Sequence, residues 1–116
     1  MTQEEEKLLL KDLCARLPHY TMVLMGDGGV EPLVSVNVNT GICNGLKGLP
    51  KPYLRPMSSM TEEERKEYNK VMFQSERYEY DYAADVDWLI ENHFDYRGLI
   101  PMGLAIEAPE DMYKTE

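Results

Sequence analysis

Apolar residues recur at helical spacing near the start of the chain. Leu9, Leu13 and Leu17 are four positions apart, so they share one face of a helix. Thr2 and Glu5 precede them with the spacing of a capping box, in which the threonine oxygen accepts an early backbone N–H and the glutamate reaches back. The pattern predicts an amphipathic helix that ends before the proline at position 18.

The spacing changes from helical to alternating in the next segment. Val34, Val36 and Val38 alternate with serine and asparagine, which predicts a half-buried strand. The Gly-Asp-Gly-Gly run at residues 26–29 predicts a tight reversal before this strand, because glycine adopts positive φ at little cost.

Turn residues divide the rest of the first half into short strands. Residues 39–41, Asn-Thr-Gly, predict a second turn, and residues 42–43 a short third strand. The proline-rich segment that follows should be a loop with a brief edge strand at residues 53–55, because proline cannot donate to a central ladder.

The second half of the chain begins with another helix start. Thr61 and Glu64 repeat the capping-box spacing, and acidic residues fill the first turn. No glycine or proline interrupts the next thirty residues, so one long helix is possible. We favour two helices, because residues 78–85 alternate aromatic and acidic side chains and make a poor helix core. Asp81 would cap the second helix.

The last third of the chain is expected to pack through this second helix. Val86, Leu89 and Ile90 would point inward, with Trp88 at the helix edge. The pattern of residues 95–103 predicts a single helical turn that Asp95 caps and Gly103 ends. Pro101 makes a helical conformation there less favourable. A last strand or an extended tail would follow.

These elements predict an α+β fold in a single domain over residues 1–116. An N-terminal helix is followed by a small antiparallel meander or partial barrel of three to four strands, and then by two or three C-terminal helices. Residues 1–58 hold the first helix and the strands and carry no net charge, whereas residues 59–116 form an acidic helical half. A chain of 116 residues is long enough for one core without disulfides.

Charge separates the two halves sharply. Residues 59–116 hold six basic and fifteen acidic side chains, so the whole net charge of −9 lies there. Lys47, Lys51 and Arg55 lie in a stretch without acids. Because the molecule as a whole would repel a polyanion, direct nucleic-acid binding is disfavoured.

Neither a membrane segment nor a targeting segment is indicated. No apolar run approaches the roughly 20 residues needed to cross a bilayer. The first residues are acidic where a signal peptide would be basic. We therefore expect a cytoplasmic protein that does not bind membranes.

The two cysteines give no sign of chemistry. Cys14 and Cys43 are expected to be reduced, partly buried thiols. Neither has a CxxC partner, and together with His19 and His93 they lack the ligand spacing of a zinc site. We expect no metal and no cofactor.

The best candidates for polar chemistry are His93, Asp95 and Arg97. A histidine with a carboxylate two residues away is the raw material of acid–base catalysis, but no nucleophile is tied to it by sequence. The alternative is a helix C-terminus, with His93 beside the last carbonyls, Asp95 as a cap and Arg97 on the acidic surface. We favour the helix C-terminus.

A run of tyrosines lies at the centre of the acidic half. Tyr78, Tyr80 and Tyr82 alternate with carboxylates. They could be a half-packed helix junction, which we favour, or a recognition surface, because tyrosine is enriched at interfaces and carboxylates steer a basic partner.

Arg55 is not explained by helix initiation. It lies in a stiff segment between two prolines, at the end of the acid-free stretch. It could pair internally with a carboxylate of the second half, for which Asp95 is a candidate. It could instead face outward beside Tyr53 and Tyr96 in a partner site. We favour the internal pair.

Three stretches carry a resemblance to a known family: EEKLLLKDLCARLP at residues 5–18, PYLRPMSSMTEEE at 52–64, and DWLIENHFDYRGLIPMGLAIEAPEDMY at 87–113. They resemble a family of short acidic proteins of gut anaerobic bacteria and their phages or other mobile elements. The resemblance implies a helix, a small β-meander and further helices, but no activity, cofactor or catalytic residue. Residues 19–51 differ most from the family.

The predicted function is that of a non-catalytic interaction or accessory protein of a mobile element, with another protein, which could be basic, as its partner. The alternatives are an acidic nucleic-acid mimic that inhibits a DNA-binding or defence enzyme, and a small enzyme that uses His93 and Asp95. The candidate binding residues are Tyr53, Arg55, Tyr78, Tyr80, Tyr82, His93, Asp95, Tyr96 and Arg97.

Overall fold

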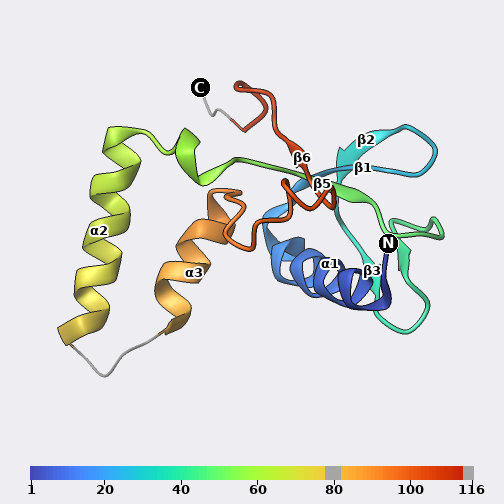
Figure 1. Cartoon of the computed structure of the whole chain (residues 1–116), viewed down its shortest axis with the longest axis horizontal. Coiled ribbons are helices and arrows are strands. Elements are labelled where there is room, and N and C mark those ends of the chain that lie inside the picture. Colours follow the sequence, from blue (N-terminus) through green and yellow to red (C-terminus); the bar gives the residue numbers. More distant parts are fainter. Residues whose placement is uncertain (78–81, 114–116) are drawn as a thin grey trace.

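The computed structural model describes residues 1–77 and 82–113, with the side chains of residues 1–71 and 86–113. Figure 1 shows one helix below a small sheet and two further helices to one side, which confirms the predicted α+β class. The helices are α1 (Gln3–Arg16), α2 (Glu62–Arg77) and α3 (Tyr82–Glu91), with short 3-10 turns η1 (Leu17–His19) and η2 (Met57–Ser59). The strands are β1 (Met22–Leu24), β2 (Val30–Pro32), β3 (Val36–Asn37), β4 (Ile42–Cys43), β5 (Lys51–Leu54) and β6 (Ile106–Glu107).

Helix α1 begins with the predicted capping box. The backbone N–H of Glu5 donates to the Thr2 hydroxyl at 3.1 Å, and the backbone N–H of Thr2 donates to the Glu5 carboxylate at 2.9 Å. Leu9 and Leu13 are fully buried against the sheet. The apolar stripe thus packs the helix, and the cap fixes where it starts.

Four strands form one sheet in the order β2-β1-β5-β6. β1 and β2 make the hairpin predicted from the glycine run, in which the N–H of Met25 donates to the carbonyl of Gly29 at 2.8 Å and Gly28 has a φ of 90°. β5 pairs antiparallel with β1, whereas β6 pairs parallel with β5. The sheet is therefore mixed and is not a simple meander.

The strand predicted at residues 53–55 lies inside the sheet, so the edge prediction was wrong. β5 covers Lys51–Leu54 and has β1 on one side and β6 on the other. Pro52 is buried opposite Val23, and Tyr53 lies opposite Ile106 of β6. The prediction was based on the backbone N–H donor that proline lacks. It could not include β6, the neighbouring strand that comes from the far end of the chain.

The strand predicted from the alternating valines is mostly absent. Val34 and Val38 are 56% and 59% exposed, and β3 covers only Val36–Asn37. The side-chain oxygen of Asn44 accepts the backbone N–H of Val34 at 2.8 Å, so a side chain satisfies a group that a ladder would have used. Alternation alone did not reveal this competition.

The second turn and the third strand are confirmed. Gly41 has a φ of 72°, and its N–H donates to the carbonyl of Asn37 at 2.8 Å. β4 follows directly and pairs antiparallel with β3 in a separate two-stranded hairpin.

Helices α2 and α3 pack side by side (Figure 1). The rings of Tyr68 and Trp88 lie 5.3 Å apart, centroid to centroid. Residues twenty positions apart in one continuous helix would be separated by about 30 Å, so the chain reverses between them. The predicted cap Asp81 lies outside the described residues.

The apolar residues form two separate cores. The main core, between α1 and the sheet, contains Leu9, Leu13, Val23, Met25, Leu33, Cys43, Leu54, Leu99, Leu104 and Ala105. The helical core contains Trp88, Leu89 and Phe94, with Met60, Tyr68, Val71 and Tyr96 packed against it.

Trp88 was predicted at a helix edge, but it is 7% exposed and its ring stacks on that of Phe94 with the centroids 5.9 Å apart, because α2 covers it. No helix in the described ranges is long and apolar enough to cross a membrane.

Residues 95–103 form turns and no helix, in contrast to the prediction. The Asp95 carboxylate accepts the backbone N–H groups of Leu99 and Ile100 at 2.8 and 2.9 Å, which is the capping role expected of it. Pro101 lacks the N–H that a helix would need there. Gly103 ends the turns with a φ of 77°, and β6 follows.

Candidate functional site

A polar seam lies between the two cores, where α1, β5 and the start of α2 meet the segments that follow α3. Its side chains come from parts of the chain far apart in sequence, and most are buried or half-buried. The seam consists of Asp12, Arg16, Arg55, Glu64, His93, Tyr96, Arg97 and Tyr113.

Asp12 is shared between two arginines. Nε of Arg16, one helical turn further along α1, donates to one Asp12 carboxylate oxygen at 2.7 Å, and both side chains are fully buried. Nε of Arg97 donates to the other oxygen at 3.0 Å. One carboxylate therefore joins α1 to the segment after α3 and gives the buried guanidinium the counter-charge that burial demands.

The remaining nitrogens of Arg16 differ in their contacts. Nη2 donates to the carbonyl of Phe94 at 2.6 Å, whereas Nη1 has no hydrogen-bond partner among the described residues. The Tyr96 ring lies 5.8 Å from the guanidinium carbon of Arg16 and 4.7 Å from that of Arg97. Burial raises the pKa of Tyr96, against the opposing effect of Arg97, so a neutral aromatic ring packs beside both cations.

Arg55 forms a two-pronged ion pair with Glu64. Its Nη1 and Nη2 donate to the two carboxylate oxygens at 2.7 Å each, and its guanidinium carbon lies 4.2 Å from the centroid of the Phe94 ring. These hydrogen bonds lower the pKa of Glu64 to about 2. Arg55 thus pairs internally with a carboxylate of the second half, and the specific partner expected from the sequence, Asp95, was wrong.

Asp95 meets Arg55 through the backbone instead. The N–H of Arg55 donates to the carbonyl of His93, and the N–H of Asp95 donates to the carbonyl of Arg55, both at 2.8 Å. The two segments run parallel at this bridge. The Asp95 carboxylate is directed to the turn that follows it, so it is not free for Arg55 or for His93.

His93 ends α3 in a backbone conformation that usually belongs to glycine. Its φ is 64°, its N–H donates to the carbonyl of Ile90 at 3.0 Å, and the N–H of Phe94 donates to the carbonyl of Leu89 at 2.9 Å. This pair of bonds is a Schellman motif with a left-handed residue just past the helix. The interpretation of His93 as a helix C-terminus is confirmed, but its placement of Arg97 on the acidic surface was wrong, because Arg97 is paired with the buried Asp12.

The imidazole of His93 is held by two neighbours. Its Nδ1 lies 3.0 Å from the hydroxyl of Thr21, and its ring stacks on Tyr113 with the centroids 3.8 Å apart. Burial, aided by the positive charge of Arg16, lowers the pKa of His93 to about 4. The ring is therefore neutral at pH 7, and it is not brought together with Asp95 as an acid–base pair.

Tyr113 inserts its hydroxyl between two strands. The hydroxyl accepts the backbone N–H of Met22 at 2.9 Å and donates to the carbonyl of Tyr53 at 2.6 Å. Burial raises the pKa of Tyr113 to about 12, so the hydroxyl keeps its proton.

The structure places the nine sequence candidates unequally. Arg55, His93, Tyr96 and Arg97 belong to the polar seam, and Asp95 adjoins it through its backbone. Tyr53 contributes its carbonyl oxygen to the Tyr113 hydroxyl. The other three are not placed: Tyr78 and Tyr80 lie outside the described residues, and the side chain of Tyr82, the first residue of α3, is not described.

Sequence reasoning missed half of the polar seam. Asp12 and Arg16 interrupt the leucine stripe of α1 at a spacing of four, and this signal could have revealed a buried pair. Glu64 was assigned to the capping box alone. Tyr113 carries no local signal, because its hydrogen-bond partners Met22 and Tyr53 lie 91 and 60 positions away.

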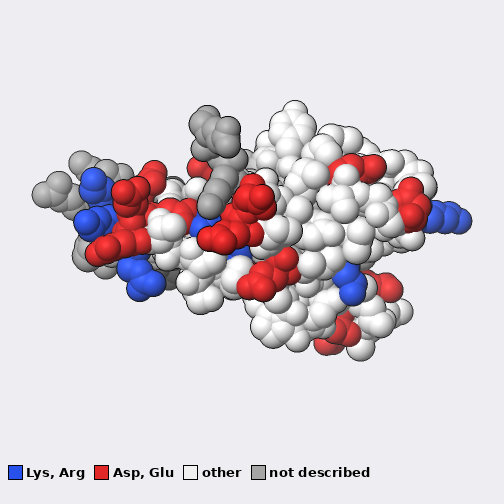
Figure 2. Space-filling model, turned by 90° about the horizontal axis from the view of Figure 1, so that it is seen from above, with Lys and Arg blue, Asp and Glu red and all other residues white. Residues whose placement is uncertain are grey.

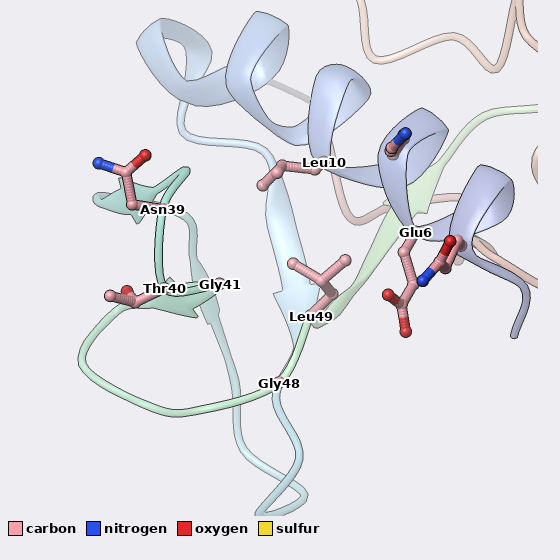
Figure 3. Close-up of a pocket in the computed structure, with 9 residues that line it drawn as sticks. Glu6, Leu10, Asn39, Thr40, Gly41, Gly48 and Leu49 are labelled. Atoms are coloured by element: carbon pink, nitrogen blue, oxygen red, sulfur yellow. The ribbon is translucent and has the colours of Figure 1, made fainter.

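A shallow groove lies apart from the polar seam, between α1 and the β3–β4 hairpin (Figure 3). Its volume is about 620 Å³, and Leu10 and Leu49 are its apolar residues. Its lining contains neither histidine nor cysteine, and its charged residues are Glu6 and Lys7. The lining residues are Gln3, Glu6, Lys7, Leu10, Asn39, Thr40, Gly41, Gly48 and Leu49.

The described part of the chain offers no metal centre. No group of three or more histidine, cysteine, aspartate or glutamate side chains within it could hold an ion. Cys14 and Cys43 are not bonded to each other, and burial raises the pKa of Cys43, which keeps it a thiol.

Comparison with known proteins gives no match. Neither protein-family models, nor curated proteins, nor solved structures match the chain.

Proposed function

We propose that this chain is a non-catalytic interaction protein that binds a basic protein partner. The observation that carries the proposal is an acidic surface of unpaired carboxylates. We define this acidic surface as Glu62 and Glu63 at the start of α2, together with Glu107, Glu110 and Asp111 in the C-terminal segment.

All five carboxylates of the acidic surface are exposed, and none has an ion-pair partner among the described side chains. The start of α2 and the C-terminal segment both lie at the top of Figure 1. Figure 2, viewed from above, shows acidic side chains over the left and the middle of that face, with basic side chains among those at the left. Like charges held together repel one another, and a cationic partner relieves that repulsion.

The polar seam supports the non-catalytic part of the proposal. Its ion pairs are internal: Asp12 with Arg16 and Arg97, and Arg55 with Glu64. These contacts hold the acidic half against the neutral half. The charged groups of the polar seam are thus already engaged in holding the two halves together.

An acidic nucleic-acid mimic is the second candidate, because the same carboxylates would imitate phosphates. The two functions differ in the partner: a mimic competes with DNA for a DNA-binding enzyme, whereas an adaptor does not. The proposal includes an association with mobile elements. This part rests on the resemblance of the three sequence stretches to the family of short acidic proteins of gut anaerobic bacteria and their mobile elements.

The test compares two charge variants with the same change of three charges. The surface variant is Glu107→Gln, Glu110→Gln and Asp111→Asn. The control variant neutralises exposed carboxylates of the other half by Glu4→Gln, Glu6→Gln and Asp27→Asn. The amide introduced at position 27 keeps a side-chain oxygen that can accept the N–H of Gly29, as the native Asp27 carboxylate does.

Both variants and the native chain are used to capture partners from a lysate of an anaerobic gut bacterium, and bound proteins are identified by mass spectrometry. We expect the same basic protein with the native chain and the control variant, and its loss with the surface variant. Equal capture by all three proteins would refute the proposal. Added DNA that releases the partner would favour the mimic.

A further inference from the structure

The C-terminal segment that carries three of the five acidic-surface carboxylates makes few hydrogen bonds with the other described residues. β6 contributes only two residues, and the N–H of Ala108 then donates to the carbonyl of Leu54 at 2.8 Å. Beyond Ala108, the N–H of Met112 bonds back to Pro109 within the segment itself. Among the described residues, the hydrogen bonds from residues 109–113 to the sheet are those of Tyr113.

The hydroxyl of Tyr113 replaces a missing rung between two strands. In the antiparallel pair of β1 and β5, Val23 lies opposite Pro52, so Met22 and Tyr53 would form the next pair. Their N–H and C=O groups are bridged by the Tyr113 hydroxyl at 2.9 and 2.6 Å. A backbone donor and acceptor that would otherwise be unpaired are thus both satisfied by one side chain.

The ring of Tyr113 is fixed as firmly as its hydroxyl. It stacks on His93 with the ring centroids 3.8 Å apart and 13° between the planes, and the Thr21 hydroxyl holds the His93 ring through Nδ1 at 3.0 Å. Stacking and hydrogen bonding act on the same side chain, so the segment is held at its far end as well as by β6.

We propose that Tyr113 is a positioning residue of the acidic surface: it holds residues 107–111 against the sheet so that their carboxylates face a basic partner together with those of Glu62 and Glu63. The inference rests on the proposed function. A residue whose backbone is already ordered in the free protein loses no further conformational entropy when the partner binds. The free energy of binding is therefore more favourable, and the affinity is higher. The partner is a basic segment of a protein, which meets a preformed array of negative charge.

The test uses a fluorescent lysine hexapeptide as the probe and measures its affinity by anisotropy at low ionic strength. Tyr113→Phe removes both hydrogen bonds and keeps the ring, whereas Tyr113→Ala removes the stacking as well. Tyr20→Phe is the matched control, because Tyr20 is 65% exposed and loses the same hydroxyl. The surface variant and the control variant are measured in parallel.

We expect Tyr113→Ala to bind about tenfold more weakly than the native chain, as the cost of ordering one residue implies. Tyr113→Phe should lie between the two, and Tyr20→Phe should bind as the native chain does. Hydrogen exchange at the Met22 amide should be faster in both Tyr113 variants. A merely structural role would change exchange and melting temperature but leave the affinity unchanged.

The outcomes separate the inference from the proposed function. If the surface variant loses binding while Tyr113→Phe and Tyr113→Ala bind as the native chain does, the inference is wrong and the acidic surface stands. If the surface variant binds like the control variant, the proposed function itself fails. Should Tyr113→Ala not fold, the affinity of Tyr113→Phe decides, and native affinity overturns the inference.

Discussion

Arg55 and Glu64 form a two-pronged ion pair that joins the end of β5 to the first turn of α2. Both hydrogen bonds measure 2.7 Å, and the side chains are 22% and 21% exposed. Glu64 has a second role, because its Oε1 also accepts the backbone N–H of Thr61 at 3.0 Å in the capping box. One carboxylate thus starts the helix and ties it to the sheet.

The pair should show energetic coupling in a double-mutant cycle of Arg55→Ala and Glu64→Gln. Its paired geometry and partial burial lead us to expect a coupling free energy of about 1 kcal/mol or more, above that of an exposed pair. The measurement is the free energy of unfolding in urea. Arg65→Ala is the control, since this exposed arginine of α2 has no ion-pair partner among the described residues. Additive losses for Arg55 and Glu64 would contradict the ion pair.

Loss of the helix cap should be measurable separately. Thr61→Ala removes the hydroxyl that accepts the N–H of Glu64 at 3.2 Å, and should lower the free energy of unfolding by about 0.5–2 kcal/mol. Ser58→Ala, at an exposed position in η2, serves as the control. An unchanged urea midpoint for Thr61→Ala would show that the cap contributes nothing to stability.

Removal of the charge on Asp12 should be the most damaging single change in the polar seam. Asp12→Asn leaves the fully buried Arg16 without its counter-charge, and we expect a loss of about 3–5 kcal/mol in the free energy of unfolding. Arg97→Gln cuts the other contact of Asp12 at a side chain that is 18% exposed, and should cost clearly less. Equal losses for the two variants would mean that burial of Arg16 is not the decisive factor.

The backbone conformation of His93 predicts an order of stability between two substitutions. His93→Ala and His93→Gly both remove the contacts with Thr21 and Tyr113, but only glycine adopts a φ near 64° without strain. We therefore expect His93→Gly to be more stable than His93→Ala by about 1 kcal/mol in thermal or urea unfolding. The reverse order would contradict the left-handed helix end.

Acidification should destabilise the fold through His93. Because burial lowers its pKa from 6.5 to about 4, the unfolded chain binds a proton between these values while the folded chain does not. Stability is fully present above the unfolded pKa and falls as the pH drops toward the folded one. We expect a loss of about 2 kcal/mol between pH 7 and pH 5, with no such loss in His93→Gln. An NMR titration of His93 that gives an ordinary pKa would exclude this origin.

The sequence by itself determined the elements whose partners lie within a turn of each other. Thr2 with Glu5 and Thr61 with Glu64 close their capping boxes across three positions, and the glycines of residues 26–29 close the first hairpin. Such contacts need only residues a few positions apart, so spacing was enough to predict them. The uneven distribution of charge is likewise a property of the sequence alone.

Only the tertiary structure decided which polar residues meet. The Nη2 of Arg16 reaches Phe94 across 78 positions, Arg97 reaches Asp12 across 85, and Tyr113 reaches Met22 across 91. Arg55 shows the same limit at a short separation, because its partner Glu64 is only nine positions away and spacing alone did not distinguish it from Asp95. The same chain end supplies β6, which turned a predicted edge strand into an inner one. The choice depends on how the two cores pack, because burial leaves each charged group only the partner that packing brings within reach.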